Sequence, residues 1–137
     1  MIHKSNNIIL SIPPRHDDSA RLREIVEGVA LPENIIVVRS IENLLRILRQ
    51  PLNGVAAAVI FDATEQELNS LLPFKELLLR MPVILVLPNS SRETVAKGHS
   101  LRPRFVTFAD SDFSDVRDVL QKMLGRISNI EAGFNQN

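Results

Sequence analysis

The chain has 137 residues, a length typical of one domain, and 45% of them are hydrophobic, enough to form a sizeable core. Sixteen Lys and Arg balance sixteen Asp and Glu, which argues against a nucleic-acid-binding domain, because such domains normally carry a basic excess. Cysteine is absent, which excludes disulfides, thiolate metal sites and a cysteine nucleophile, and fits a reducing compartment.

The N-terminal segment and the length of the apolar runs argue against secretion and membrane insertion. Only five mostly apolar residues precede Pro13 and Pro14, too few for the core of a signal peptide. No apolar run approaches the ~18 residues that are needed to span a bilayer. We therefore expect a soluble, cytoplasmic protein without membrane contact.

Short continuous apolar runs alternate with helical stripes along the whole chain. The continuous runs predict strands at residues 7–12, 35–38, 55–61, 83–87 and 104–108. Each strand is followed by apolar residues at a spacing of three and four, which predict helices at residues 22–29, 41–48, 64–72, 90–98 and 116–127. The regular alternation indicates strands that are connected by helical crossovers.

Polar residues just before these stripes predict where the helices begin. The N-cap candidates are Asp17, Asp18 or Ser19 for the first helix and Ser40 for the second. Thr64 and Glu67 have the spacing of a capping box before the third helix. Ser90 and Glu93 repeat that spacing before the fourth. Pro73 interrupts the third helix, so either the helix kinks there or a second short helix begins with Pro73 near its first turn.

The order β-α, repeated five times, predicts an α/β fold with a five-stranded parallel sheet that is doubly wound, of the flavodoxin or receiver type. We expect the strand order 2-1-3-4-5. The domain is predicted to cover residues 1–127, and residues 128–137 are expected to form a mobile C-terminal tail. In such a sheet, ligands bind outside the carboxyl ends of the strands.

The residues at the end of the third predicted strand resemble a known family. Five βα units in this length, with Val59-Ile60-Phe61-Asp62 closing the third strand, resemble the receiver domains of response regulators over about residues 7–125. The resemblance implies that Asp62 is the phosphoacceptor. It also implies that Asp17 and Asp18 are an acidic pair that holds Mg²⁺ together with Asp62. A carboxylate that attacks phosphorus needs such a cation and fixed donors to the phosphoryl oxygens.

The sequence departs from the receiver pattern at three places. Receivers have Ser or Thr at the end of the fourth strand, where this chain has Leu87 and Pro88. They have a lysine at the end of the fifth strand, but no lysine occurs here between Lys97 and Lys122. The segment 13–16 separates the acidic pair from the first strand. These departures predict a pseudo-receiver in which aspartyl phosphorylation is impaired or absent.

Each candidate residue also has a purely structural interpretation. Asp62 can begin a turn or cap the following helix, and Asp17 and Asp18 can serve as an N-cap and a first-turn acid without any metal.

A turnover enzyme is not indicated, because the sequence has no Gly-rich phosphate loop, Gly-x-Ser-x-Gly elbow or His-x-x-x-His pair.

Three functions remain open at this point. The first is a stand-alone receiver-like signalling domain that acts through protein–protein contact. The second is a working single-domain response regulator that is phosphorylated at Asp62. The third is a small-molecule sensor or a module like the anti-sigma antagonists, in which Thr64 would take the place of their phosphoserine; the regular alternation argues against that module.

The chain ends shortly after the fifth helix, so we expect it to dock to a separate signalling protein or histidine kinase, or to form a homodimer. In receivers the last helix, the last strand and the preceding helix commonly form the contact surface, which implies residues 92–124 here. The mixed charges of this face suit reciprocal ion pairs across a two-fold interface. Its candidate residues are Arg92, Lys97, Arg102, Arg104, Phe108, Asp112, Asp115, Arg117 and Asp118.

Overall fold

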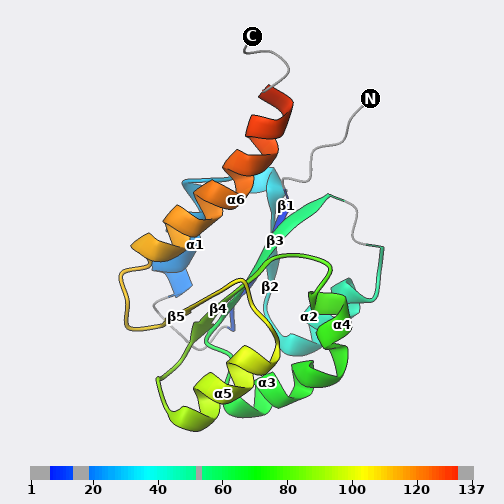
Figure 1. Ribbon diagram of the computed structural model, residues 1–137, viewed down its shortest axis with the longest axis vertical. Helices are drawn as coiled ribbons and strands as arrows, with labels where there is room; N and C mark the ends of the chain where they lie inside the picture. The colour runs from blue at the N-terminus through cyan, green and yellow to red at the C-terminus, as the bar shows by residue number, and fades with distance from the viewer. Residues whose placement is uncertain (1–6, 14–18, 52–53, 133–137) are drawn as a thin grey trace.

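Five parallel strands form one sheet in the computed structural model of the protein (Figure 1). The structure describes residues 7–13, 19–51 and 54–132, with side chains at 7–13, 20–51 and 54–125. The strand order is β2-β1-β3-β4-β5, which confirms the predicted topology. The strands are β1 (Asn7–Ser11), β2 (Ile35–Val38), β3 (Val55–Phe61), β4 (Val83–Leu87) and β5 (Phe105–Phe108).

Helices connect each strand to the next. Within the described residues they are α1 (Ser19–Glu27), α2 (Ile41–Leu48), α3 (Glu65–Leu71), α4 (Lys75–Leu78), α5 (Arg92–Ser100) and α6 (Ser114–Ala132), with 3-10 turns η1 (Pro32–Asn34) and η2 (Leu72–Phe74). Pro73 lies in the first turn of η2, after α3 has ended. The second interpretation of this proline, a new helical segment rather than a kink, is therefore confirmed.

Both faces of the sheet are covered by helices, so the molecule has two apolar cores. On one face, Leu10 of β1 packs in a cluster with Leu22 of α1 and Leu120 of α6. On the other face, Ile9 belongs to a cluster with Leu68 and with residues of α2, α4 and β4. Figure 1 shows α1 and α6 on one side of the sheet and α2 to α5 on the other. Neighbouring residues of one strand thus point into different cores, as expected for strands buried on both faces.

Side-chain capping bonds fix the first turns of α2 and α3. The Ser40 hydroxyl accepts a hydrogen bond from the Asn43 N–H at 3.1 Å, as predicted. The capping box is also confirmed: the Thr64 hydroxyl accepts from the Glu67 N–H at 3.1 Å, and the Glu67 carboxylate accepts from the Thr64 N–H at 2.9 Å. These bonds satisfy amide donors that the helix itself leaves unpaired.

The predicted capping box of Ser90 and Glu93 is wrong. Ser91 is the N-cap of α5, and its hydroxyl accepts from the Thr94 N–H at 3.3 Å. The Ser91 N–H in turn donates to the Asn89 side chain at 3.0 Å. This turn carries the chain one residue further before the helix begins, so the cap moves from Ser90 to Ser91.

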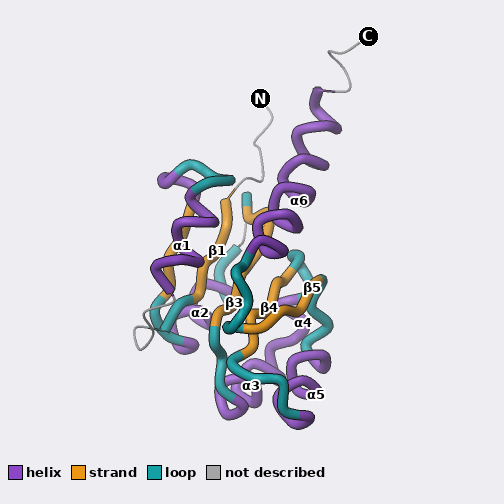
Figure 2. The backbone as a smooth tube through the Cα atoms, turned by 90° about the vertical axis from the view of Figure 1, so that its left-hand side faces the viewer, coloured by secondary structure: helices purple, strands orange, loops and turns teal. Residues whose placement is uncertain are grey.

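The last helix is longer than its apolar stripe. α6 continues to Ala132, five residues beyond the last residue of the helix predicted at 116–127. No Gly or Pro stands between Ile127 and Gly133 to end the helix earlier. Figure 2 shows α6 projecting beyond the sheet, and residues 133–137 lie outside the described residues. Neither α6 nor any other described helix is long and apolar enough to cross a bilayer.

Core substitutions should destabilise the fold far more than a change at Asp62. Ile84 and Leu120 are fully buried, so replacing either with Ala should lower the free energy of unfolding by about 2–4 kcal/mol, and Val59→Ala by somewhat less. Asp62→Asn should cost much less, because Asn tolerates the same backbone conformation. Urea denaturation of the four variants would measure this order. If Asp62→Asn is the most destabilising of them, Asp62 has a structural role instead.

Candidate functional site

The loops that leave the strands meet at one edge of the sheet, which we call the carboxyl edge. The strands are all parallel, so their carboxyl ends share this edge. Asp62 directly follows β3, Pro13 lies beyond β1, and Arg39 directly follows β2. The carboxyl edge is therefore the place where a receiver-like site would be assembled.

Asp62 is buried directly after the end of β3 and is tied to β4 by its backbone. Its N–H donates to the Val86 carbonyl at 2.7 Å, which extends the pairing of β3 with β4 by one residue. Its φ of 61° lies in the left-handed region, which Asp and Asn adopt more readily than most residues. Only 3% of the residue is exposed. Asp62 is therefore almost completely covered by the rest of the protein.

The strand register identifies the residues beside Asp62. Phe61 pairs with Val86, so the next residue along β3, Asp62, stands opposite Leu87 of β4. Leu87 in turn pairs with Phe108 of β5. Leu87 is fully buried and Phe108 is half-buried, and both pack in the core on the α3–α5 side. The row that crosses the sheet from Asp62 therefore contains two apolar side chains.

Aromatic packing occupies the other side of the carboxyl edge. Phe61 and Phe113 meet edge to face, with ring centroids 5.9 Å apart and an interplanar angle of 82°. The Arg21 guanidinium lies 5.4 Å from the centre of the Phe113 ring. Phe113 is fully buried and has a φ of 63°, an uncommon backbone conformation for a bulky residue. The loop after β5 thus contributes an aromatic ring that packs on Phe61, the residue before Asp62.

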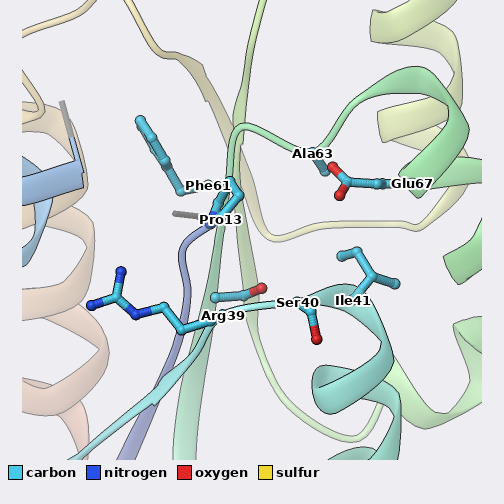
Figure 3. Close-up of a pocket in the computed structure, with 8 residues that line it drawn as sticks. Pro13, Arg39, Ser40, Ile41, Phe61, Ala63 and Glu67 are labelled. Atoms are coloured by element: carbon cyan, nitrogen blue, oxygen red, sulfur yellow. The ribbon is translucent and has the colours of Figure 1, made fainter. Parts of the chain in front are cut away.

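A small pocket opens between the ends of β1, β2 and β3 (Figure 3). Its volume of about 10 Å³ is room for roughly one water molecule. Its polar lining includes Ser11, Ser40 and Glu67, and the Glu67 carboxylate accepts the capping bond from Thr64. Figure 3 shows the Arg39 side chain extending to the opposite side of the pocket from Glu67. The pocket is too small for an organic ligand.

The expected Mg²⁺ site is only partly covered by the structure. Asp62 lies at the carboxyl edge, but Asp17 and Asp18 lie outside the described residues. Among the side chains that are described, no three His, Asp or Glu residues come together as metal ligands. Asp62 by itself does not make a site for Mg²⁺, which takes six ligands in a near-octahedral arrangement.

No protein-family model matches the sequence, and neither does any curated protein. Solved structures do match the fold. The signal receiver domain of a histidine kinase from Syntrophus aciditrophicus has a TM-score of 0.63 and 14% identity, with 88% of this chain and 91% of that domain covered. The phosphorylated cyanobacterial phytochrome response regulator RcpA has a TM-score of 0.60 and 14% identity, with 89% and 91% covered. The chain has the receiver fold.

The chain is also similar in fold to a protein from Burkholderia pseudomallei that is described as a putative pilus assembly-related protein. That structure has a TM-score of 0.64 and 16% identity, with 92% of this chain and 95% of that chain covered. At these identities the likeness extends to the fold and leaves the chemistry to be argued from the residues. Two of the three departures from the receiver pattern, those at the ends of β4 and β5, fall in the same row as Asp62, at Leu87 and Phe108.

The candidate contact residues divide between the two ends of β5. Phe108 lies at the carboxyl end, whereas Arg104 lies just before the amino end. Arg92 is exposed at the start of α5, but the Lys97 ammonium pairs with Glu65 of α3 at 3.2 Å and so faces away from β5. The predicted face is thus less continuous than its sequence range suggests.

The remaining candidates lie on or near α6. The Asp115 carboxylate accepts a hydrogen bond from the Thr107 hydroxyl at 2.8 Å and so ties α6 to β5. Arg117 is exposed, and its guanidinium lies 3.7 Å from the carboxylate of the neighbouring Asp118. Asp112 is exposed in the loop between β5 and α6. Arg117, Asp118 and Asp112 are therefore the candidates of this region that solvent reaches.

Asp112 should make the stability depend on pH. The Ser114 N–H and hydroxyl donate to its carboxylate at 3.0 and 2.8 Å, and these bonds, with a smaller contribution from Arg21, lower the pKa of Asp112 below 3.8. A lowered folded-state pKa stabilises the fold above about pH 4, and this stabilisation is lost as the pH falls through the folded-state value.

The test compares the wild type with Asp112→Asn by urea denaturation between pH 6 and pH 3. The wild type should be the more stable at pH 6, and the difference should shrink on acidification. Asp110→Asn, which changes an exposed carboxylate in the same loop, is the matched control. A difference that stays constant down to pH 3 would show that the charge of Asp112 does not matter.

Proposed function

We propose that the chain is a cytoplasmic receiver-like signalling domain that acts by protein–protein contact, with aspartyl phosphorylation impaired or absent. The observation that carries this proposal is the row of Asp62, Leu87 and Phe108 across the carboxyl edge. Receivers have a hydroxyl and a lysine at the places of the last two residues. Here both side chains are apolar and belong to the core.

The physical argument rests on the charge of the phosphoryl group. Phosphoryl transfer is catalysed almost entirely by positioning and by compensation of the oxygen charges. A lysine supplies a charge-assisted hydrogen bond, one of the stronger kinds, and Phe108 offers none. Leu87 cannot donate a hydrogen bond either. A phosphoryl group on Asp62 would therefore lack two of its usual partners.

The burial of Asp62 supports the same conclusion. In-line attack requires the acceptor oxygen, the phosphorus and the leaving group to lie in one line, with the donor entering from solvent. An aspartate with 3% exposure leaves little room for that approach. The alternative, a working response regulator phosphorylated at Asp62, would require the carboxyl edge to open first.

The module like the anti-sigma antagonists gains no support from Thr64. The hydroxyl of Thr64 caps α3, and Glu67 completes the capping box, so a helix-stabilising role accounts for this threonine. The small-molecule sensor is likewise not favoured at the carboxyl edge, where the pocket holds about 10 Å³. We therefore keep protein–protein contact as the proposed mode of action.

We predict that the protein does not become phosphorylated by acetyl phosphate with Mg²⁺ and does not bind beryllofluoride. Intact-mass measurement should show no gain of a phosphoryl group, and two-dimensional NMR should show no shifts centred on Asp62 and Phe108. Asp62→Asn is the control for modification elsewhere. A gain of one phosphoryl group in the wild type that is lost in Asp62→Asn would contradict the proposal and establish the working regulator.

We also predict that the partner-binding face includes the α5–β5–α6 region and supports a homodimer. β5 is an edge strand of the sheet, so this side is not covered by a further strand. Arg92 and Arg117 are exposed there. Changing both to Glu should weaken the dimer in light scattering, whereas Arg46→Glu on α2 should not. A wild type that stays monomeric at high concentration would remove the homodimer.

A further inference from the structure

A second, larger pocket lies at the opposite edge of the sheet from Asp62. Its volume is about 240 Å³, and it is lined by residues 79–83, which lead into β4, and by Arg102 and Arg104, which precede β5. We call it the amino-edge pocket. β4 and β5 are parallel neighbours, so the loops before them emerge side by side. Arg80 of the first loop and the two arginines of the second line the same cavity.

Backbone and side-chain bonds hold both loops in place. The Arg104 N–H donates to the Val83 carbonyl at 2.7 Å, which joins the two loops where they enter the sheet. The Arg80 guanidinium donates to the Leu48 carbonyl at 2.7 Å, at the end of α2. The pocket is therefore fixed by the fold and does not have to be assembled by a ligand.

The amino-edge pocket is lined by three arginines and by no acidic residue. Within the part of the chain that the structure describes, no carboxylate forms an ion pair with Arg80, Arg102 or Arg104. The chain as a whole is neutral, so this positive charge is local. The three arginines that line the cavity carry like charges, which create a positive potential that attracts anions.

The backbone at Arg102 gives a second reason to look for a role of its side chain. Arg102 follows the end of α5 and has a φ of 54°. Helices commonly end on a residue in this left-handed conformation, and that residue is usually Gly because a side chain is strained there. A cation thus occupies a position where Gly would fit the backbone better.

We propose that the amino-edge pocket binds the phosphate group of a small molecule. Guanidinium groups bind phosphate through paired, charge-assisted hydrogen bonds. A single carboxylate has two oxygens, whereas phosphate has enough acceptor oxygens to serve three arginines at once. The volume is below the roughly 300–1,000 Å³ of pockets that enclose drug-sized ligands, so a phosphate group with a small substituent fits best. This proposal is independent of phosphorylation at Asp62.

The experiment is an NMR titration of the full chain with inorganic phosphate and with pyrophosphate at low salt. Amide shifts should centre on residues 79–83 and 102–104. Arg102→Gly with Arg104→Gln should weaken binding by at least about tenfold, since two charge-assisted contacts are lost. Gly suits the left-handed backbone at 102, so the fold should be preserved. Arg46→Gln, which removes an exposed arginine of α2, should bind as the wild type does.

Three results would overturn the proposal. One is the absence of localised shifts with either anion. Another is an equal loss of affinity in Arg46→Gln, which would mean that only overall charge matters. The third is binding of succinate as tight as that of pyrophosphate, which would assign the pocket to carboxylates. A further experiment uses vesicles that contain phosphatidic acid. If the protein sediments with them, the bound phosphate group belongs to a lipid. If it does not, the ligand is a soluble phosphate compound.

Discussion

The burial of β3 and β4 on both faces is the constraint on which the rest of this structure depends. Every residue of β4, and all but the first of β3, is buried. A strand in this situation has no face left for polar chemistry, because an unpaired polar side chain would be desolvated at a cost. Charged residues of this sheet are consequently confined to the two edges where the strands begin and end. Asp62 stands at one edge and the three arginines at the other.

This constraint also explains how much of the fold the sequence could predict. A strand buried on both faces is a continuous apolar run, and the helix after it has one apolar stripe, so the alternation and the strand order followed directly. Local details did not follow. Ser90 and Ser91 both have a polar residue three positions on, and only the turn made by Asn89 selects Ser91. The end of α6 was missed because a helix can outlast its apolar stripe when no Gly or Pro stops it.

The candidate site at the carboxyl edge could be predicted from the sequence only for a residue that directly follows a strand. Asp62 was found because it directly follows an apolar strand. That Leu87 and Phe108 share its row depends on the register between strands, which the sequence does not contain. Arg80 was missed, although a signal existed: arginines precede both the fourth and the fifth strand, and adjacent parallel strands begin at the same edge. The buried Phe113, with its left-handed backbone, gave no comparable signal.

The strand β5 runs from the amino edge of the sheet to the carboxyl edge. This edge strand has four residues, so Arg104 before its start and Phe108 at its end belong to one short segment. An anion shared by Arg80, Arg102 and Arg104 would draw together the loops that enter β4 and β5, and would stabilise their pairing. The Arg104–Val83 hydrogen bond already joins these loops, so such an anion would add to an arrangement that the fold has formed. Anion binding at the amino edge and any chemistry at Asp62 thus depend on different residues at opposite ends of the same parallel strands.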